Sequence, residues 1–127
     1  MAQPDLVGIV VSNMAASLRF YRLLGLDIPP NIESEQHVEV TLANGFRIAW
    51  DNLEMMKSID PDWIDPIGQR MTVAFKCESP EEVDRLYERV VQSGYQGHKA
   101  PWDAFWGQRY AVVIDPDGNL VDLFAGL

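Results

Sequence analysis

The same order of local signals occurs twice along the chain, and this repetition restricts the folds that the chain can adopt. In the first half, the apolar, β-branched run at residues 6–11 predicts a buried strand. Asn13 is placed to cap a helix over residues 14–24 with one apolar face, and a glycine follows where helices commonly end. Residues 37–51 predict two strands joined by an Asn-Gly dipeptide, a strong hairpin signal.

The second half repeats this order with different residues. Residues 71–77 predict a strand. Residues 79–94 predict a helix with a serine cap, a proline in the first turn, a glutamate three residues after the cap and a glycine at the end. Residues 107–115 and 119–127 predict two more strands around a Pro-Asp-Gly turn. The repetition is one of pattern, because the two halves share little sequence identity.

These signals predict an α+β fold of two βαβββ modules within a single domain of 127 residues. We expect the first module at about residues 4–57 and the second at about residues 70–127. Residues 58–69 contain two prolines and a glycine, which predicts a tether between the modules.

Composition restricts the partners and the compartment. The formal charge of −9 opposes binding to nucleic acid or to an anionic membrane, and it makes a neutral or cationic ligand easier to accept. No apolar run reaches the roughly 18 residues of a membrane span, and the N-terminus has no basic segment of the kind that begins a secretory signal. Cys77 is the one cysteine, which fits a cytoplasmic location.

Two motifs carry a resemblance to a known superfamily. "FYRLLG" at the end of the first helix and "WGQRY…DPDGN" in the last hairpin resemble the vicinal-oxygen-chelate superfamily. That group includes glyoxalase I, extradiol dioxygenases, fosfomycin-resistance enzymes and bleomycin-resistance proteins. The resemblance covers nearly the whole chain. It implies sheets that curl into a cleft, and commonly a homodimer.

The enzymes of that superfamily hold a divalent metal ion with side chains of the first and last strands of each module. At the matching positions this chain has Leu6 and, in the second module, Met71 or Thr72, none of which binds such a metal. The last strand of the first module offers no clean donor before Asp51, and only Asp122 keeps a carboxylate. We therefore expect no metal, no cofactor and no catalytic residue, and we interpret Cys77 as a small buried hydrophobe.

Longer stretches narrow the resemblance to the mitomycin-binding drug-resistance proteins of antibiotic producers. These stretches are "GFRIAWDNLE", "SIDPDWIDP" and "GYQGHKAPWDAFWGQRYA". In those relatives a flat drug is stacked between an aromatic residue and a histidine, and the matching positions here are Trp106 and His37. Residues 30–36 match no pattern of the relatives. The resemblance predicts a protein of antibiotic biosynthesis and resistance that sequesters a planar aromatic antibiotic.

A planar chromophore needs flat, rigid walls, and aromatic side chains near the strand ends supply them. The antibiotics that we consider are of the mitomycin type, the bleomycin type, or peptides that bear quinoline or quinoxaline rings. The residues that we expect to bind the ligand are His37, Glu39, Trp50, Asp51, Met55, Trp63, Trp102, Phe105, Trp106, Arg109 and Tyr110.

Structural roles compete with these binding roles. Trp50 lies in a predicted strand, where it could belong to the core. Trp63 lies in the predicted tether, where it could pack across the two modules. Arg109 could pair with a carboxylate instead of a ligand, and Trp106 could be structural. Two other functions stay open, a metal-dependent lyase or dioxygenase and a carrier of a biosynthetic intermediate.

Overall fold

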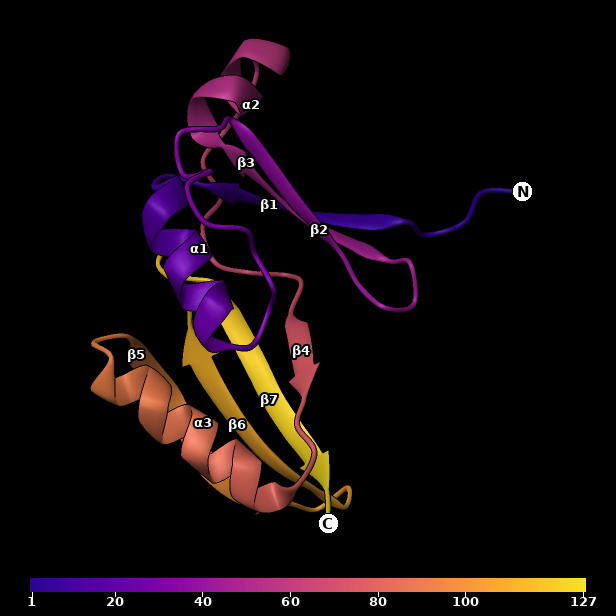
Figure 1. Cartoon of the computed structure of the whole chain (residues 1–127), viewed down its shortest axis with the longest axis vertical. Coiled ribbons are helices and arrows are strands. Elements are labelled where there is room, and N and C mark those ends of the chain that lie inside the picture. The colour runs from indigo at the N-terminus through magenta and orange to yellow at the C-terminus, as the bar shows by residue number, and fades with distance from the viewer. The chain divides into compact units, whose positions relative to one another are not determined.

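A computed structural model describes residues 1–127 and divides into two compact units, Met1–Asp65 and Pro66–Leu127 (Figure 1). The boundary falls within the segment 58–69 that the sequence predicts as a tether. Each unit contains one β-sheet and at least one helix, so the predicted α+β class is confirmed. None of the three helices has the length and apolar character needed to cross a membrane.

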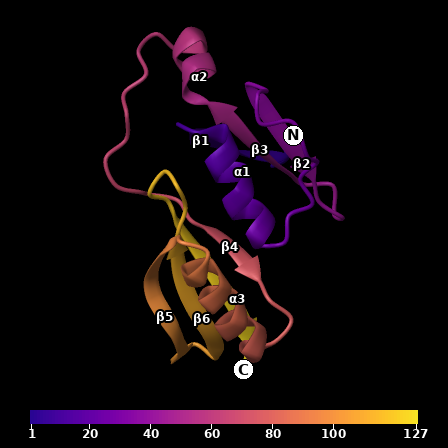
Figure 2. The ribbon, with the colours of Figure 1, turned by 60° about the vertical axis from the view of Figure 1, so that its left-hand side comes forward.

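The first unit is a three-stranded sheet with two helices. Its elements are β1 (Leu6–Val11), α1 (Met14–Leu23), β2 (His37–Thr41), β3 (Arg47–Asn52) and α2 (Leu53–Ile59). The strand order is β1-β3-β2, in which β1 runs parallel to β3 and β2 runs antiparallel to it. Helix α1 connects β1 to the hairpin and lies beside the sheet (Figure 2).

One face of this sheet forms the hydrophobic core of the first unit. Alternate residues of the hairpin, such as Val38, Val40 and Ile48, are buried on it. Trp50 lies on the same face with 0 % exposure, and its ring centroid is 5.5 Å from that of Tyr21 on α1. The period-two alternation leaves the opposite face of the sheet open to polar side chains.

The second unit is a four-stranded sheet with one helix, as the βαβββ pattern predicts. Its elements are β4 (Val73–Lys76), α3 (Pro80–Gln92), β5 (Gln96–Ala104), β6 (Gln108–Ile114) and β7 (Leu120–Gly126). The strand order is β4-β7-β6-β5, in which β4 runs parallel to β7. Helix α3 covers one face of this sheet, where it contacts β5, β6 and β7 (Figure 1).

The predicted helix caps are confirmed. The side chain of Asn13 accepts a hydrogen bond from the Ala16 amide at 3.0 Å, and Ser79 Oγ accepts one from the Glu82 amide at 3.1 Å. The Glu82 carboxylate reaches back to the amide of Glu78, the residue before the cap, at 2.6 Å. These bonds satisfy amide groups that the first turn of a helix leaves without partners.

Two features differ from the sequence prediction. The first unit has three strands in place of four, because the residues between α1 and β2 form no strand. Part of that segment is held by Arg22, whose guanidinium donates to the carbonyls of Ile28 and Pro29 and pairs with Glu33 at 3.0 Å. Helix α2 is an element that the sequence analysis did not predict. Strand β5 completes the four strands of the predicted βαβββ module, although no residues had been assigned to it.

Candidate ligand-binding site

The face of the second sheet opposite α3 carries a row of aromatic side chains. The strand register places Trp102, Tyr110 and Phe124 side by side on β5, β6 and β7. The ring centroid of Tyr110 lies 5.6 Å from that of Trp102 and 6.1 Å from that of Phe124. Neighbouring strands are about 4.8 Å apart, so the row spans about 10 Å across the sheet. We call these three residues the aromatic row.

Trp106 extends the aromatic row at the turn between β5 and β6. Its ring centroid lies 6.1 Å from that of Trp102 and 5.3 Å from that of Tyr110, in both cases edge to face. The indole N–H donates to Gln108 Oε1 at 2.8 Å, which fixes the ring orientation. The residue is 49 % exposed, so a large flat surface of Trp106 is available to a ligand. Its neighbour Phe105 is 98 % exposed, with its centroid 5.1 Å from that of Trp106.

A hydrogen bond between two side chains lies beside the aromatic row. The Tyr110 hydroxyl donates to Asp122 Oδ2 at 2.6 Å. Burial, together with the Asp122 carboxylate, raises the pKa of Tyr110 to about 12. Tyr110 therefore stays protonated at neutral pH and acts as a donor, not as a nucleophile or a base.

The open face of the first sheet carries charged side chains around His37. Its Nδ1 atom is 2.5 Å from Asp51 Oδ1, and its Nε2 atom is 3.4 Å from Glu39 Oε1. The hydrogen bond to Asp51 is the main cause that raises the pKa of His37. Arg47 pairs with Glu39 at 2.7 Å and with Asp5 at 2.5 Å, and the bond from Arg47 lowers the pKa of Glu39. The imidazole is thus held between two carboxylates, which favours its protonated form.

Two of the expected ligand-binding residues lie on the opposite faces of their sheets. Trp50 belongs to the core of the first unit, which agrees with its alternative role in the sequence analysis. Arg109 faces α3, where it pairs with Asp84 at 2.9 Å, and it also pairs with Asp103 at 3.1 Å. Since alternate residues of a strand face opposite sides, Arg109 points away from its neighbour Tyr110. The structure therefore does not bring these two residues to the candidate site.

Met55 and Trp63 lie outside the two strand clusters. Met55 is part of α2, where its amide donates to the Asn52 side chain at 2.8 Å as the helix begins. Trp63 follows α2, and its indole N–H donates to Asp65 Oδ1 at 3.0 Å. Both side chains are half-buried within the first unit.

Phe124 was absent from the expected binding residues, and Asp122 was named in the sequence analysis only as the carboxylate kept at a metal position. Both are on the open face of β7, where Phe124 is opposite Tyr110 and Asp122 is opposite Val112. The period-two alternation of residues 120–126 could have revealed them, since Phe124 and Asp122 share a face and flank the buried Leu123.

The residues at the family's metal positions do not fit a divalent ion. Leu6 lies on the open face of β1, whereas Met71 and Thr72, the positions expected in the second module, precede β4. The residue of β4 in register with Asp122 is Ala74, and none of these side chains is a metal donor. Asp51 is bonded to His37 and Asp122 to Tyr110. No group of three or more His, Cys, Asp or Glu side chains is placed to hold a metal ion.

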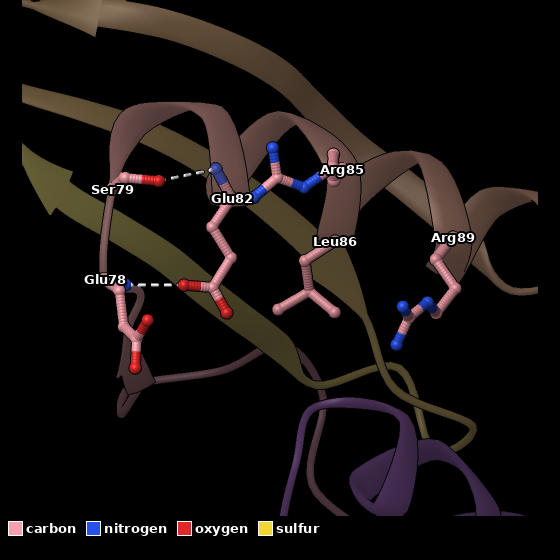
Figure 3. A pocket seen from close by; sticks show the side chains of 6 residues that line it. All are labelled: Glu78, Ser79, Glu82, Arg85, Leu86 and Arg89. Atoms are coloured by element: carbon pink, nitrogen blue, oxygen red, sulfur yellow. Dashed lines mark hydrogen bonds between the residues drawn. The ribbon is translucent and has the colours of Figure 1, made fainter.

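A surface hollow also lies along α3 (Figure 3). It begins at Glu78 and Ser79 and continues along α3 to its last turn, with Arg85, Leu86 and Arg89 lining it. It contains no aromatic side chain, and the acids that line it are partly used in the helix cap. The hollow therefore lacks the flat walls that distinguish the aromatic row.

Comparison with known proteins places the chain in a family. Residues 3–123 match the Glyoxalase/Bleomycin resistance protein/Dioxygenase superfamily, and the chain belongs to this superfamily. No curated protein gives a significant match. This membership confirms the resemblance at the level of the superfamily, which includes both enzymes and proteins that only bind.

Several solved structures share the fold. A glyoxalase/bleomycin resistance protein/dioxygenase family enzyme from Burkholderia phytofirmans PsJN is 21 % identical with a TM-score of 0.85, covering 99 % of this chain and 100 % of that one. A glyoxalase-related enzyme from Fulvimarina pelagi is 22 % identical with a TM-score of 0.83, covering 99 % and 89 %. Protein ATC0852 from Agrobacterium tumefaciens is 25 % identical with a TM-score of 0.78, covering 100 % and 99 %. These similarities establish the fold.

Proposed function

We propose that the protein binds a planar aromatic antibiotic without altering it, and that sequestration in the cytoplasm protects the producing cell. The observation that supports this most directly is the aromatic row with Trp106 at its end. Trp102, Tyr110, Phe124 and Trp106 come from three strands and a turn, and they present half-exposed rings on one face of one sheet. Such a surface suits the broad apolar face of a fused-ring ligand.

The energetics of stacking support a binding role. Each base-like ring that stacks on an aromatic side chain gains about 1–3 kcal/mol. Two such contacts contribute about 2–6 kcal/mol, which is a large part of the roughly 8 kcal/mol of a micromolar complex. We propose Trp106 as one wall. In the mitomycin-binding proteins that the sequence resembles, the second wall is a histidine, and the matching position here is His37.

The side chains with reactive groups favour binding over covalent chemistry. Tyr110 is held protonated by Asp122 and by burial, as described above. Cys77 is 6 % exposed, and burial raises the pKa of its thiol, so little reactive thiolate is present at neutral pH. Neither group is prepared to attack a ligand.

A titration of intrinsic tryptophan fluorescence against a panel of antibiotics tests this function. The panel contains a mitomycin, a bleomycin and quinoline and quinoxaline peptides, with a non-aromatic aminoglycoside as the control. We expect saturable changes with at least one planar compound and none with the aminoglycoside. Mass spectrometry of the recovered compound after long incubation should show the unaltered antibiotic. A product with a new mass would contradict a purely binding role, and no response to any planar compound would contradict the function as a whole.

A further inference from the structure

We propose that the open face of the second sheet selects planar aromatic ligands that carry an acidic group, a carboxylate or an acidic phenol, at the edge of the ring system. This inference rests on the proposed function and specifies its ligand class. It departs from the expectation, drawn from the net charge, that a neutral or cationic ligand is easier to accept.

A lysine stands at each end of the aromatic row. Lys76 of β4 is in register with Phe124, so it continues the row on the fourth strand of the sheet. At the other end, Lys99 Nζ lies 4.0 Å from the centroid of the Trp102 ring. The row therefore runs from one ammonium group to the other across the full width of the sheet.

Neither lysine has a carboxylate partner, and this distinguishes the two sheets. Every charged side chain around His37 on the first sheet, including Arg47 and Asp51, takes part in an ion pair. On the second sheet, Lys76 and Lys99 make no ion pair, and both are exposed. Two lysines without a carboxylate partner at the ends of one aromatic surface are therefore free to pair with an anionic group of a ligand.

Because Lys99 lies on the Trp102 ring, a ligand that stacks on this ring also changes the surroundings of the Lys99 charge. Its ammonium covers the face of Trp102, a cation–π contact that is weak where water can reach it. A flat ligand that stacks on Trp102 displaces this ammonium. An acidic group at the ligand's edge then forms an ion pair with the displaced ammonium group, whereas a neutral ligand leaves this ammonium group without a partner.

Asp122 determines where the ligand's acidic group can lie. Asp122 and Lys99 are both in register with Val112, so the carboxylate lies in the row of residues next to the aromatic row. Only one of its oxygens accepts the Tyr110 hydroxyl, and the carboxylate repels an anion at the centre of the sheet. The acidic group therefore lies at an end of the aromatic row, near Lys76 or Lys99.

Three probes with one ring system and nearly equal shape separate stacking from charge. They are naphthalene-2-carboxylate, naphthalene-2-carboxamide and naphthalene-2-carboxamidine, titrated calorimetrically into the full-length protein. We expect the carboxylate to bind about fivefold more tightly than the neutral carboxamide, and the cationic amidine to bind most weakly. Added salt should reduce the advantage of the carboxylate and leave the carboxamide unchanged.

Variants test which residues provide the selection. Lys76→Gln and Lys99→Gln should each lower the carboxylate affinity by up to about fivefold, the upper range for an exposed ion pair, without weakening the carboxamide. Lys57→Gln removes the same charge from α2 of the first unit and should change nothing. Light scattering of each variant follows the oligomeric state.

Each outcome decides between the proposals. Equal affinity for the three probes, or tightest binding of the amidine, would overturn the selection of acids while the proposed function stands. If none of the probes binds while the antibiotic panel gives a response, the selection of acids is overturned and the proposed function stands; if neither the probes nor the panel bind, both proposals fail. If the lysine variants change the oligomeric state and leave the probe affinities alone, the open face is a contact between copies of the chain, and the selection of acids is overturned.

Discussion

The Nδ1 atom of His37 lies 2.5 Å from a carboxylate oxygen of Asp51, directly across the β2–β3 pair. This contact is the main cause that raises the pKa of His37, with Glu39 at the other ring nitrogen as a further cause. The pair therefore makes one side of the first sheet sensitive to pH near neutrality.

Asp51→Asn should lower the pKa of His37 toward the ordinary value of about 6.5. Because the folded state has the raised pKa, the pair's contribution to stability is fully present below about pH 6.5 and is lost as the pH rises through the folded pKa. The His37 side chain is 42 % exposed, so this contribution stays below about 1 kcal/mol. NMR titration of the His37 ring and urea unfolding at several pH values measure both effects.

The control for that variant is Asp62→Asn, which removes an equal charge from an exposed position after α2. It should leave the His37 titration unchanged. If Asp51→Asn and wild type titrate alike at His37, the short contact between the two side chains does not persist in solution.

Trp106→Ala should weaken antibiotic binding by roughly 5- to 150-fold, the range of one lost stacking contact. His37→Ala should lose less, because an imidazole offers a smaller face. Trp106→Phe should recover much of the loss, since a flat ring remains. Because Trp106 is 49 % exposed, the thermal midpoint of Trp106→Ala should fall little. Unaltered affinity with a collapsed midpoint would instead assign Trp106 a structural role.

Trp50→Ala should destabilise the protein by about 3–5 kcal/mol, the cost of removing a fully buried aromatic side chain. Trp50→Phe should cost far less, because the Trp50 indole N–H is buried without a hydrogen-bond partner and phenylalanine removes this penalty. Chemical unfolding of both variants gives the comparison. A loss of stability in Trp50→Phe as large as that in Trp50→Ala would mean that the cavity left by the smaller ring outweighs the removal of the unpaired N–H.

Drug binding should survive a strong chelator, because the residues in register with Asp51 on β1 and with Asp122 on β4 are Val10 and Ala74, which are not metal donors. Elemental analysis of the purified protein should find no stoichiometric nickel, zinc, iron or manganese. One tightly held transition metal per chain, lost together with binding on chelation, would support the lyase or dioxygenase alternative.

A C₂ homodimer is the expected assembly, since the superfamily resemblance implies sites that two chains complete. Light scattering should give about twice the chain mass of 14.4 kDa, and calorimetry should give equivalent sites. A monomer that binds the antibiotic with full affinity would contradict this assembly.

The elements with strong local signals were predictable from sequence. The caps at Asn13 and Ser79 form as expected, and so does the hairpin at Gly45, whose φ of 88° few other residues adopt easily. Helix α2 was missed because it has seven residues and buries none of them fully, which leaves little apolar periodicity. Its one local signal was Asn52, which caps it.

The βαβββ pattern required strand β5, but its residues were not assigned from the sequence, for a different reason. Its pairing with β6 shifts register between Gly97 and Lys99 and again between Lys99 and Trp102. Each irregularity interrupts the alternation by which a strand is recognised in sequence. The sequence therefore predicted the aromatic residues of this region only as flat walls of a binding site. Their alignment with Tyr110 and Phe124 depends on a strand register that the sequence does not show.

The absence of a fourth strand in the first unit makes β2 the edge of its sheet, paired only with β3. An edge strand exposes backbone groups that can recruit strands of other molecules, and charged side chains oppose such recruitment. His37 and Glu39 are two of the exposed side chains on this edge. Their charges oppose strand-to-strand pairing between molecules, so replacing both with apolar residues should make the protein precipitate as its concentration rises.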